Sequence, residues 1–169
     1  MDADFRIGKG FDLSATTMLT PYLGAGWRDW HRDLTPLGPS GYKEDYTHGY
    51  VGAGLLFQWA PASRWVVSAN GLVGSTFDPH IDVTLFPIPP ANFGEGLGTN
   101  VIYMAGLAVD YAITNQWHAN AGVDFTHFAY GAGPMLPPDG RNEPDSRTNL
   151  WTVKAGFGYS WGAPIVAKY

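Results

Sequence analysis

Three groups of residues carry side chains whose types could do chemistry. The segment Asp78-Pro-His-Ile-Asp82 places a histidine between two carboxylates, a donor set that could ligate a metal ion. The segment from Asp139 to Asp145 supplies oxygen donors of the kind that bind calcium, but it lacks the ligand spacing and final glutamate of an EF-hand. His118 and Asp124 share one face of a predicted strand, six residues and about 20 Å apart.

Each group has a simpler interpretation, which we prefer. A single histidine in a long polar loop indicates a solvated loop, and a mixture of Asp, Gly and Asn is typical of turns. A catalytic base needs a nucleophile and an orienting partner within hydrogen-bond reach, so we interpret His118 as a polar lining residue. The sequence also has no Gly-x-Ser-x-Gly motif and no phosphate-binding glycine loop. We therefore expect no enzyme activity, no catalytic residue, no metal and no cofactor.

The elements that must position these residues are β-strands, because apolar residues recur with a period of two along most of the chain. From Trp151 to Trp161, alternate residues are apolar or aromatic and the intervening ones are small or polar. Similar patterns predict seven strands, at roughly 4–13, 18–33, 48–60, 64–77, 100–112, 116–130 and 147–161. In the first strand Lys9 interrupts the apolar face, and a bulge at Gly8 or Gly10 would turn it inward.

The connections alternate in length. Short turns are expected at 14–17, 61–63 and 113–115, and long polar loops at 34–47, 78–99 and 131–146. This alternation is typical of an outer-membrane β-barrel, with the short turns on the periplasmic side. The sequence thus predicts an all-β fold, an antiparallel up-and-down transmembrane β-barrel forming a single domain over residues 1–169.

The composition agrees with this fold. Charged residues make up 15% of the chain and mean hydropathy is only -0.12, a combination that fits a barrel in which alternate residues are apolar. No apolar run reaches the ~18 residues of a membrane-spanning helix. The net charge of -5 leaves no basic footprint for nucleic acid, and the absence of cysteine excludes disulfides.

The two strand faces differ in chemistry. One face is predicted to line the barrel interior with the polar residues Arg6, Asp12, Arg28, Asn70, Asp110, His118, Asn120, Asp124 and Lys154. The other carries aromatic residues eight to ten positions apart, which predicts two girdles at the membrane interfaces, roughly 20–25 Å apart. The girdle residues are Trp27, Trp59, Trp65, Tyr103, Tyr111, Trp117, Phe125, Trp151, Tyr159 and Trp161, and we expect Tyr50 to stand with the loop-side set.

Seven strands are an odd number, whereas single-chain bacterial barrels use even numbers. We expect an eight-stranded barrel, with one strand preceding the strand at 4–13. The alternative is an extra strand within the loop at 78–99, around Ile81 to Leu85.

Three segments carry a resemblance to a known family: Leu19-Thr-Pro-Tyr-Leu-Gly-Ala-Gly-Trp-Arg-Asp-Trp, Gly41-Tyr-Lys-Glu-Asp-Tyr and Val153-Lys-Ala-Gly-Phe-Gly-Tyr-Ser-Trp. The chain resembles the small outer-membrane barrels that include OmpA-like domains, OmpX-like proteins and porin-family surface antigens. The resemblance implies residence in the outer membrane of a Gram-negative bacterium, among its lipids and lipopolysaccharide. It also implies that barrel-assembly machinery reads the C-terminal strand, whose terminal aromatic is Trp161 or Tyr169.

The predicted function is therefore a non-enzymatic outer-membrane barrel with a structural or adhesin-like role, whose loops contact a host or another surface. Three rivals stay open: a soluble lipocalin-like barrel that binds a ligand, a small outer-membrane enzyme that modifies lipid, and a narrow porin-like channel. In the lipocalin-like barrel the apolar face would line the inside.

Overall fold

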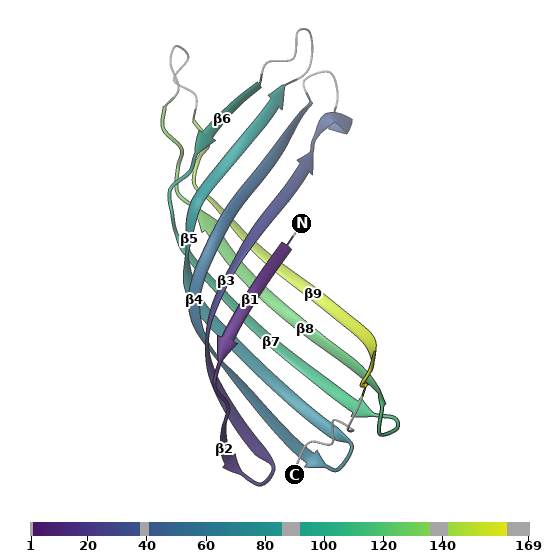
Figure 1. Ribbon diagram of the computed structural model, residues 1–169. Coiled ribbons are helices and arrows are strands. Elements are labelled where there is room, and N and C mark those ends of the chain that lie inside the picture. The colour runs from purple at the N-terminus through teal and green to yellow at the C-terminus, as the bar shows by residue number, and fades with distance from the viewer. Residues whose placement is uncertain (1, 38–40, 86–91, 136–141, 162–169) are drawn as a thin grey trace.

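The computed structural model describes residues 2–37, 41–85, 92–135 and 142–161. These residues form one antiparallel sheet whose strands follow one another in chain order (Figure 1). The expected all-β, up-and-down architecture is confirmed at this level. Among the described residues, no helix is long and apolar enough to span a membrane.

The strands and the single short helix have the following bounds: β1 Asp2–Gly8, β2 Phe11–Ser14, β3 Thr17–Asp33, η1 Thr35–Leu37, β4 Tyr42–Ala62, β5 Trp65–Leu85, β6 Asn92–Gly96, β7 Val101–Ala112, β8 Trp117–Tyr130 and β9 Ser146–Tyr159. Neighbours in the sheet follow the order β1-β3-β4-β5-β7-β8-β9, while β2 pairs with β3 and β6 pairs with β5. In the described residues no hydrogen-bonded pairing joins the two edge strands, β1 and β9.

The sheet is tilted and strongly curled, and β3, β4 and β5 project well beyond β1 at the end opposite the short turns (Figure 1). One cavity is lined by side chains from β1 and from β7, β8 and β9, which shows that the edges curl toward a common hollow. Local hydrogen bonds set the short turns. Thr114 Oγ1, for example, accepts the backbone N–H groups of Gln116 and Trp117 at 3.2 and 2.9 Å.

The first predicted strand is divided in two. β1 and β2 are separated at Lys9 and Gly10, which confirms an irregularity at this place. The expected inward turn of Lys9 is not what the structure shows, because its ammonium lies 5.6 Å from the ring centre of Phe11, an exposed aromatic. The cation–π contact offers this lysine a partner on the apolar face.

Two predicted loops are largely strand, and this is a correction to the expected boundaries. β4 begins at Tyr42 instead of 48, and β5 continues to Leu85 instead of 77. Ile81 to Leu85 is therefore the end of β5, and the additional strand of this region is β6, which pairs with it. The extensions form because the segments pair with each other, from Tyr42↔Leu85 to Thr47↔His80.

A bulge at Asp78 divides β5 into two parts, and odd-numbered side chains lie on opposite faces of the sheet in the two parts. Asp78 has a positive φ of 48°, and the register with β4 shifts between Thr47↔His80 and Gly49↔Phe77. One extra residue in a strand reverses which side chains face inward. Val73 is therefore exposed before the bulge, whereas Ile81, at an odd position after it, is fully buried.

The buried core lies at the end of the sheet away from the short turns, which we call the loop end. Its members come from β3, β4, β5, β7 and β8, together with Leu97 just after β6: Tyr22, Tyr46, Tyr50, Leu72, Ile81, Val83, Leu97, Ile102, Phe128 and Tyr130. Most of them lie on the parts of β4, β5 and β8 nearest the loops. The rest of the sheet has an exposed apolar face and a polar hollow, described next.

Candidate functional site

One face of the sheet is an extended apolar surface. Val153 is 84% exposed, Phe157 78%, Val73 64% and Leu107 59%, and each of these residues occupies an odd position in its strand. Burying apolar surface stabilises by about 25 cal/mol per Å², so a face of this extent is unfavourable in water. Contiguous apolar patches of this kind mark a surface that meets a protein or a membrane.

Aromatic side chains gather at both ends of this apolar surface. Near the short turns, Trp65 packs on Tyr111 with ring centres 4.6 Å apart, and Trp117 packs on Tyr159 at 5.0 Å. Tyr159 also packs on Trp161, and Trp59 is exposed opposite Thr17. These contacts form two groups at the same end of the sheet, Trp65 with Tyr111 and Trp117 with Tyr159 and Trp161, and Trp59 on β4 lies at that end too.

The loop-side row is made of Trp27, Tyr103, Phe125 and Trp151. Phe125 lies 4.8 Å from Trp151 and 6.1 Å from Tyr103, measured between ring centres, and Trp27 is 44% exposed on β3. Tyr103 and Tyr111 are eight residues apart on β7, which gives about 26 Å along the strand and about 20 Å when projected at a strand tilt of ~40°.

Tyr50 does not belong to this row, which corrects the expectation from the sequence. It is 5% exposed and lines the polar cavity beside Arg28. Its ring fills the space above Gly26, where an added Cβ would lie 2.5 Å from Tyr50 Cε1. Glycine at position 26 therefore lets a large aromatic lie flat against the inner face.

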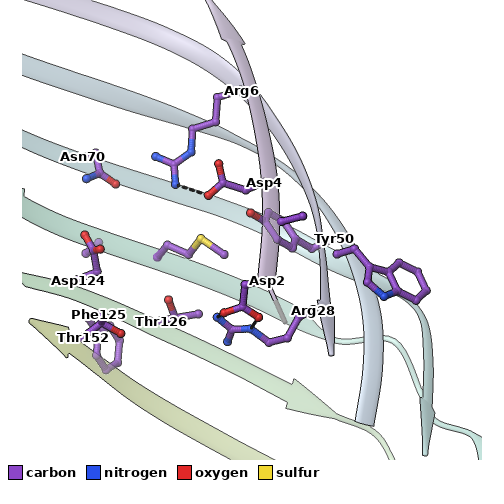
Figure 2. Close-up of a pocket in the computed structure, with 14 residues that line it drawn as sticks. Asp2, Asp4, Arg6, Arg28, Tyr50, Asn70, Asp124, Phe125, Thr126 and Thr152 are labelled. Carbon is purple, nitrogen blue, oxygen red and sulfur yellow. Dashed lines mark hydrogen bonds and ion pairs between the residues drawn. The ribbon is translucent and has the colours of Figure 1, made fainter. Parts of the chain in front are cut away.

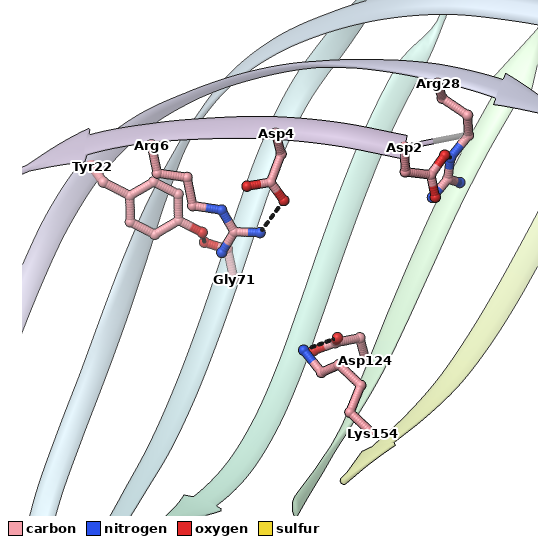
Figure 3. Close-up of polar contacts among 8 residues, drawn as sticks. All are labelled: Asp2, Asp4, Arg6, Tyr22, Arg28, Gly71, Asp124 and Lys154. Atoms are coloured by element: carbon pink, nitrogen blue, oxygen red, sulfur yellow. Dashed lines mark hydrogen bonds and ion pairs between the residues drawn. The ribbon is translucent and has the colours of Figure 1, made fainter. Parts of the chain in front are cut away.

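The opposite face lines a hollow with paired charges. Arg28 donates two hydrogen bonds of 3.0 Å to the carboxylate of Asp2, and Arg6 lies 3.4 Å from Asp4 (Figures 2 and 3). Lys154 on β9 forms an ion pair with Asp124 on β8, and both point into the same hollow (Figure 3). The cavity between these groups has a volume of about 230 Å³.

The remaining predicted lining residues occupy different places. Asn70 lines the cavity, and the absence of a side chain at Gly106 makes room for it and for Asp124. Asn120 lies against Gly156, near the short turns. Asp12 lies on β2, exposed, and is not among the residues that line the cavity.

His118 has a partner that sequence reasoning missed. Its Nδ1 lies 2.7 Å from Oδ2 of Asp110 on the neighbouring strand, and both residues border a second cavity at the short-turn end. The carboxylate that the sequence places on the same face of the same strand is Asp124. Cross-strand register, which brings Asp110 opposite Asn120, supplies the closer carboxylate. Asp2, the partner of Arg28 on the neighbouring strand, was missed for the same reason, whereas Asp4 lies two residues from its partner Arg6 on β1 itself.

A cluster of aromatic side chains packs at the loop end of the sheet, next to Arg28. Tyr46 stacks between Trp30 and Tyr130, with ring centres 5.5 Å apart on each side. Tyr130 and the fully buried His48 share a hydrogen bond of 2.7 Å, and Phe128 packs on His48 at 5.2 Å. We call these five residues, Trp30, Tyr46, His48, Phe128 and Tyr130, the loop-end seal.

Buried polar groups surround the loop-end seal. Tyr46 donates a hydrogen bond to Glu143 at 2.9 Å, the Glu143 N–H donates to Glu95, and Arg32 pairs with Glu44. Burial raises the pKa of Glu44, although the Arg32 charge opposes this. Burial, aided by the charge of Arg28, lowers the pKa of His48 to about 4. His48 pairs across from Arg28, one residue beyond the loop-side aromatic Trp27.

Within the described residues, neither of the two segments weighed as metal candidates brings its donors together as a site. The segment Asp78 to Asp82 is part of β5 instead of a loop, with His80 Nε2 3.5 Å from Asp82 Oδ1. Asp139, Gly140 and Arg141 of the calcium candidate lie outside the described residues, while Glu143 bonds Tyr46 and Asp145 accepts the Ala132 N–H. In the part of the chain that the structure describes, no three His, Asp or Glu residues are placed to hold a metal ion.

A comparison of the chain with protein-family models, curated proteins and solved structures finds no match. The candidate site thus has three features: an apolar surface between two aromatic rows, a hollow with paired charges, and an aromatic cluster at the loop end.

Proposed function

We propose that this chain is an integral β-barrel protein of a bacterial outer membrane, non-enzymatic, with a structural or surface-contact role. The observation that carries the proposal is the exposed apolar face bounded on both sides by aromatic side chains. Indole and phenol rings favour the headgroup level of a bilayer, and the separation of about 20 Å is close to the ~25 Å apolar band of outer-membrane barrels.

The polarity of the two faces argues against the soluble lipocalin-like alternative. In such a barrel the apolar side chains line the cavity and the polar ones meet water. Here Lys154 and Asp124 point into the hollow, while Phe157, on the same strand as Lys154, is 78% exposed. An inside that is charged and an outside that is apolar is the arrangement suited to lipid.

The directions of the edge strands support a barrel of eight strands. Six antiparallel steps lead from β1 to β9, so these two strands run in the same direction. One further strand between them, antiparallel to both, closes the cylinder and removes both edges. A second copy in the same membrane orientation offers β1 only a parallel β9, so it does not provide an antiparallel closure.

The loop-end seal favours a closed interior over the narrow channel. Tyr46 and Tyr130 are each 2% exposed and stack on one another in the core at the loop end. The charges beneath the seal are paired, which is the expected content of a small barrel whose interior is filled by side chains. The proposed partners are accordingly membrane lipids, lipopolysaccharide, barrel-assembly machinery through β9, and surface ligands at the loops.

Expression behind a signal peptide, followed by membrane fractionation, tests the proposal. We expect the protein in the outer-membrane fraction, resistant to carbonate and urea extraction, and a faster gel mobility before boiling than after it. Recovery in the soluble periplasmic fraction as a monodisperse, detergent-free protein would refute it. Labelled lipopolysaccharide incubated with the same preparation tests the enzyme rival, for which acyl loss or transfer in mass spectra is the positive result.

A further inference from the structure

The outer face beyond the loop-side aromatic row has charges of opposite sign on its two halves. On β3, β4 and β5, this face carries Asp29, His31, Asp33, Lys43, Asp45, His80 and Asp82, which is acidic overall. Ion pairs join His31 to Asp45, Lys43 to Asp33 and His80 to Asp82. The corresponding ends of β8 and β9, residues 126–130 and 146–150, contain no acidic residue.

Three side chains on β8 and β9 form a basic and amide-bearing group just beyond this row. In register order, Phe125↔Trp151 is followed by His127↔Asn149 and then by Ala129↔Arg147. The His127 ring stacks on Tyr103 with centres 4.4 Å apart, and its Nδ1 lies 2.7 Å from Asn149 Oδ1. Within the described residues Arg147 is exposed and has no ion-pair partner.

We propose that His127, Asn149 and Arg147 bind the phosphate of a lipid headgroup. This inference rests on the proposed membrane location. The proposal follows from the charge of these residues and from their position along the membrane normal. If the loop-side aromatic row marks the headgroup boundary, residues two to four positions further along a tilted strand lie about 5–10 Å beyond that boundary. Arginine binds phosphate through a fork of two N–H donors. The amide nitrogen of Asn149 adds a neutral donor, and His127, whose Nδ1–H donates to Asn149 Oδ1, adds Nε2–H in its imidazolium form.

The acidic residues of β3, β4 and β5 on the outer face confine this site to β8 and β9. A phosphate beside Asp45 or Asp82 would meet like charge, whereas beside Arg147 it meets a cation that no described residue pairs with. The stacking of His127 on Tyr103 holds the imidazole at the surface, so the site is largely formed before a lipid arrives. Asp145 lies two residues before Arg147, but its carboxylate already accepts the Ala132 N–H at 2.7 Å.

Native mass spectrometry of the folded protein in detergent micelles tests this site by counting retained lipids. The probes are diphosphorylated lipid A, the same lipid without phosphates, phosphatidylglycerol and inorganic phosphate. The variants are Arg147→Gln and His127→Gln. Arg64→Gln is the matched control, because Arg64 is an exposed arginine in the short turn at the opposite end.

We expect Arg147→Gln to lower the affinity for diphosphorylated lipid A about tenfold, the loss of one charge-assisted hydrogen bond, and His127→Gln to lower it less. Arg64→Gln and all binding of dephosphorylated lipid should stay unchanged. Phosphatidylglycerol competing equally would assign the site to any phosphorylated lipid, and competition by inorganic phosphate alone would overturn a lipid-headgroup site. Equal retention by wild type and Arg147→Gln would also overturn it. Failure of the wild type to enter vesicles at all would instead count against the proposed membrane function.

Discussion

The depth dependence of a charge on the apolar face tests whether that face meets lipid or water. Leu107 on β7 is 59% exposed and lies four residues from Tyr103 and four from Tyr111. Four residues span about 13 Å of strand, or about 10 Å along the membrane normal, so Leu107 marks the midplane between the two aromatic rows. We predict that Leu107→Arg destabilises the protein folded in lipid vesicles by about 2–4 kcal/mol, the cost of a cation at the centre of a bilayer.

Val101→Arg is the matched control on the same strand and the same face. Val101 is 43% exposed and lies two residues beyond Tyr103, outside the span between the rows. Here the same substitution should cost about 0–1 kcal/mol, since charge is tolerated near the interface. Equilibrium urea unfolding in phospholipid vesicles, followed by tryptophan fluorescence, measures both free energies of unfolding.

The soluble alternative predicts a different pattern. An arginine on a water-exposed surface usually changes stability by no more than about 0.5 kcal/mol, at either position. Free energies of unfolding for Leu107→Arg and Val101→Arg that agree within this margin would refute a lipid-facing surface. A larger cost at Val101 than at Leu107 would refute the assignment of the midplane, even if the protein is found in membranes.

Three further predictions concern the interior. Lys154→Met should lower the free energy of unfolding by about 1 kcal/mol, because it leaves Asp124 unpaired in the hollow, and a double-mutant cycle with Asp124→Asn should show the two changes to be non-additive. Replacing both Tyr46 and Tyr130 by Ala should open the loop-end seal, so that the double variant shows conductance steps in planar bilayers that the wild type does not show. If neither the double variant nor the wild type conducts, another barrier closes the interior. Burial lowers the pKa of His48 to about 4, so the unfolded chain takes up its proton first and stability should fall as the pH drops from about 6.5 toward 4, by up to about 3 kcal/mol. His48→Gln should flatten this part of the pH profile, and an unchanged profile would assign it to other groups.

The facing of the strands could be predicted from the sequence because it depends only on local alternation. On β7, Leu107 faces outward, whereas Asp110, three residues after it, lies on the opposite face beside His118, as a period of two requires. The ends of β4 and β5 could not be predicted in this way. Residues 42–47 are mostly polar, and Pro79 interrupts 78–85, so that Ile81 to Leu85 favoured at most a separate extra strand. The two segments instead extend β4 and β5 because each supplies the other's backbone partners, a long-range effect.

The partners of the interior charges escaped prediction for a related reason. Arg28 and Asp2 are 26 residues apart, and only the register Asp2↔Arg28 between β1 and β3 brings them together. A shift of one residue would place Asp2 on the other face. The bulge at Asp78 has the same kind of consequence, because it decides that Ile81 is buried while Asp82 is exposed.

The location of the buried core separates the energetics of the protein into two regions. Within the proposed span, lipid chains are as apolar as the side chains they touch, so burial there supplies little drive for strand to pack on strand. That part depends on the backbone ladder and on paired charges such as Lys154 with Asp124. The loop-end core, with Tyr46, Ile81 and Phe128, lies in the part beyond the aromatic rows, where water is the competing solvent and burial of apolar surface stabilises. Large-to-small changes in this core should therefore lower stability by several kcal/mol while leaving membrane insertion intact, whereas charges on the outer span should impair insertion itself.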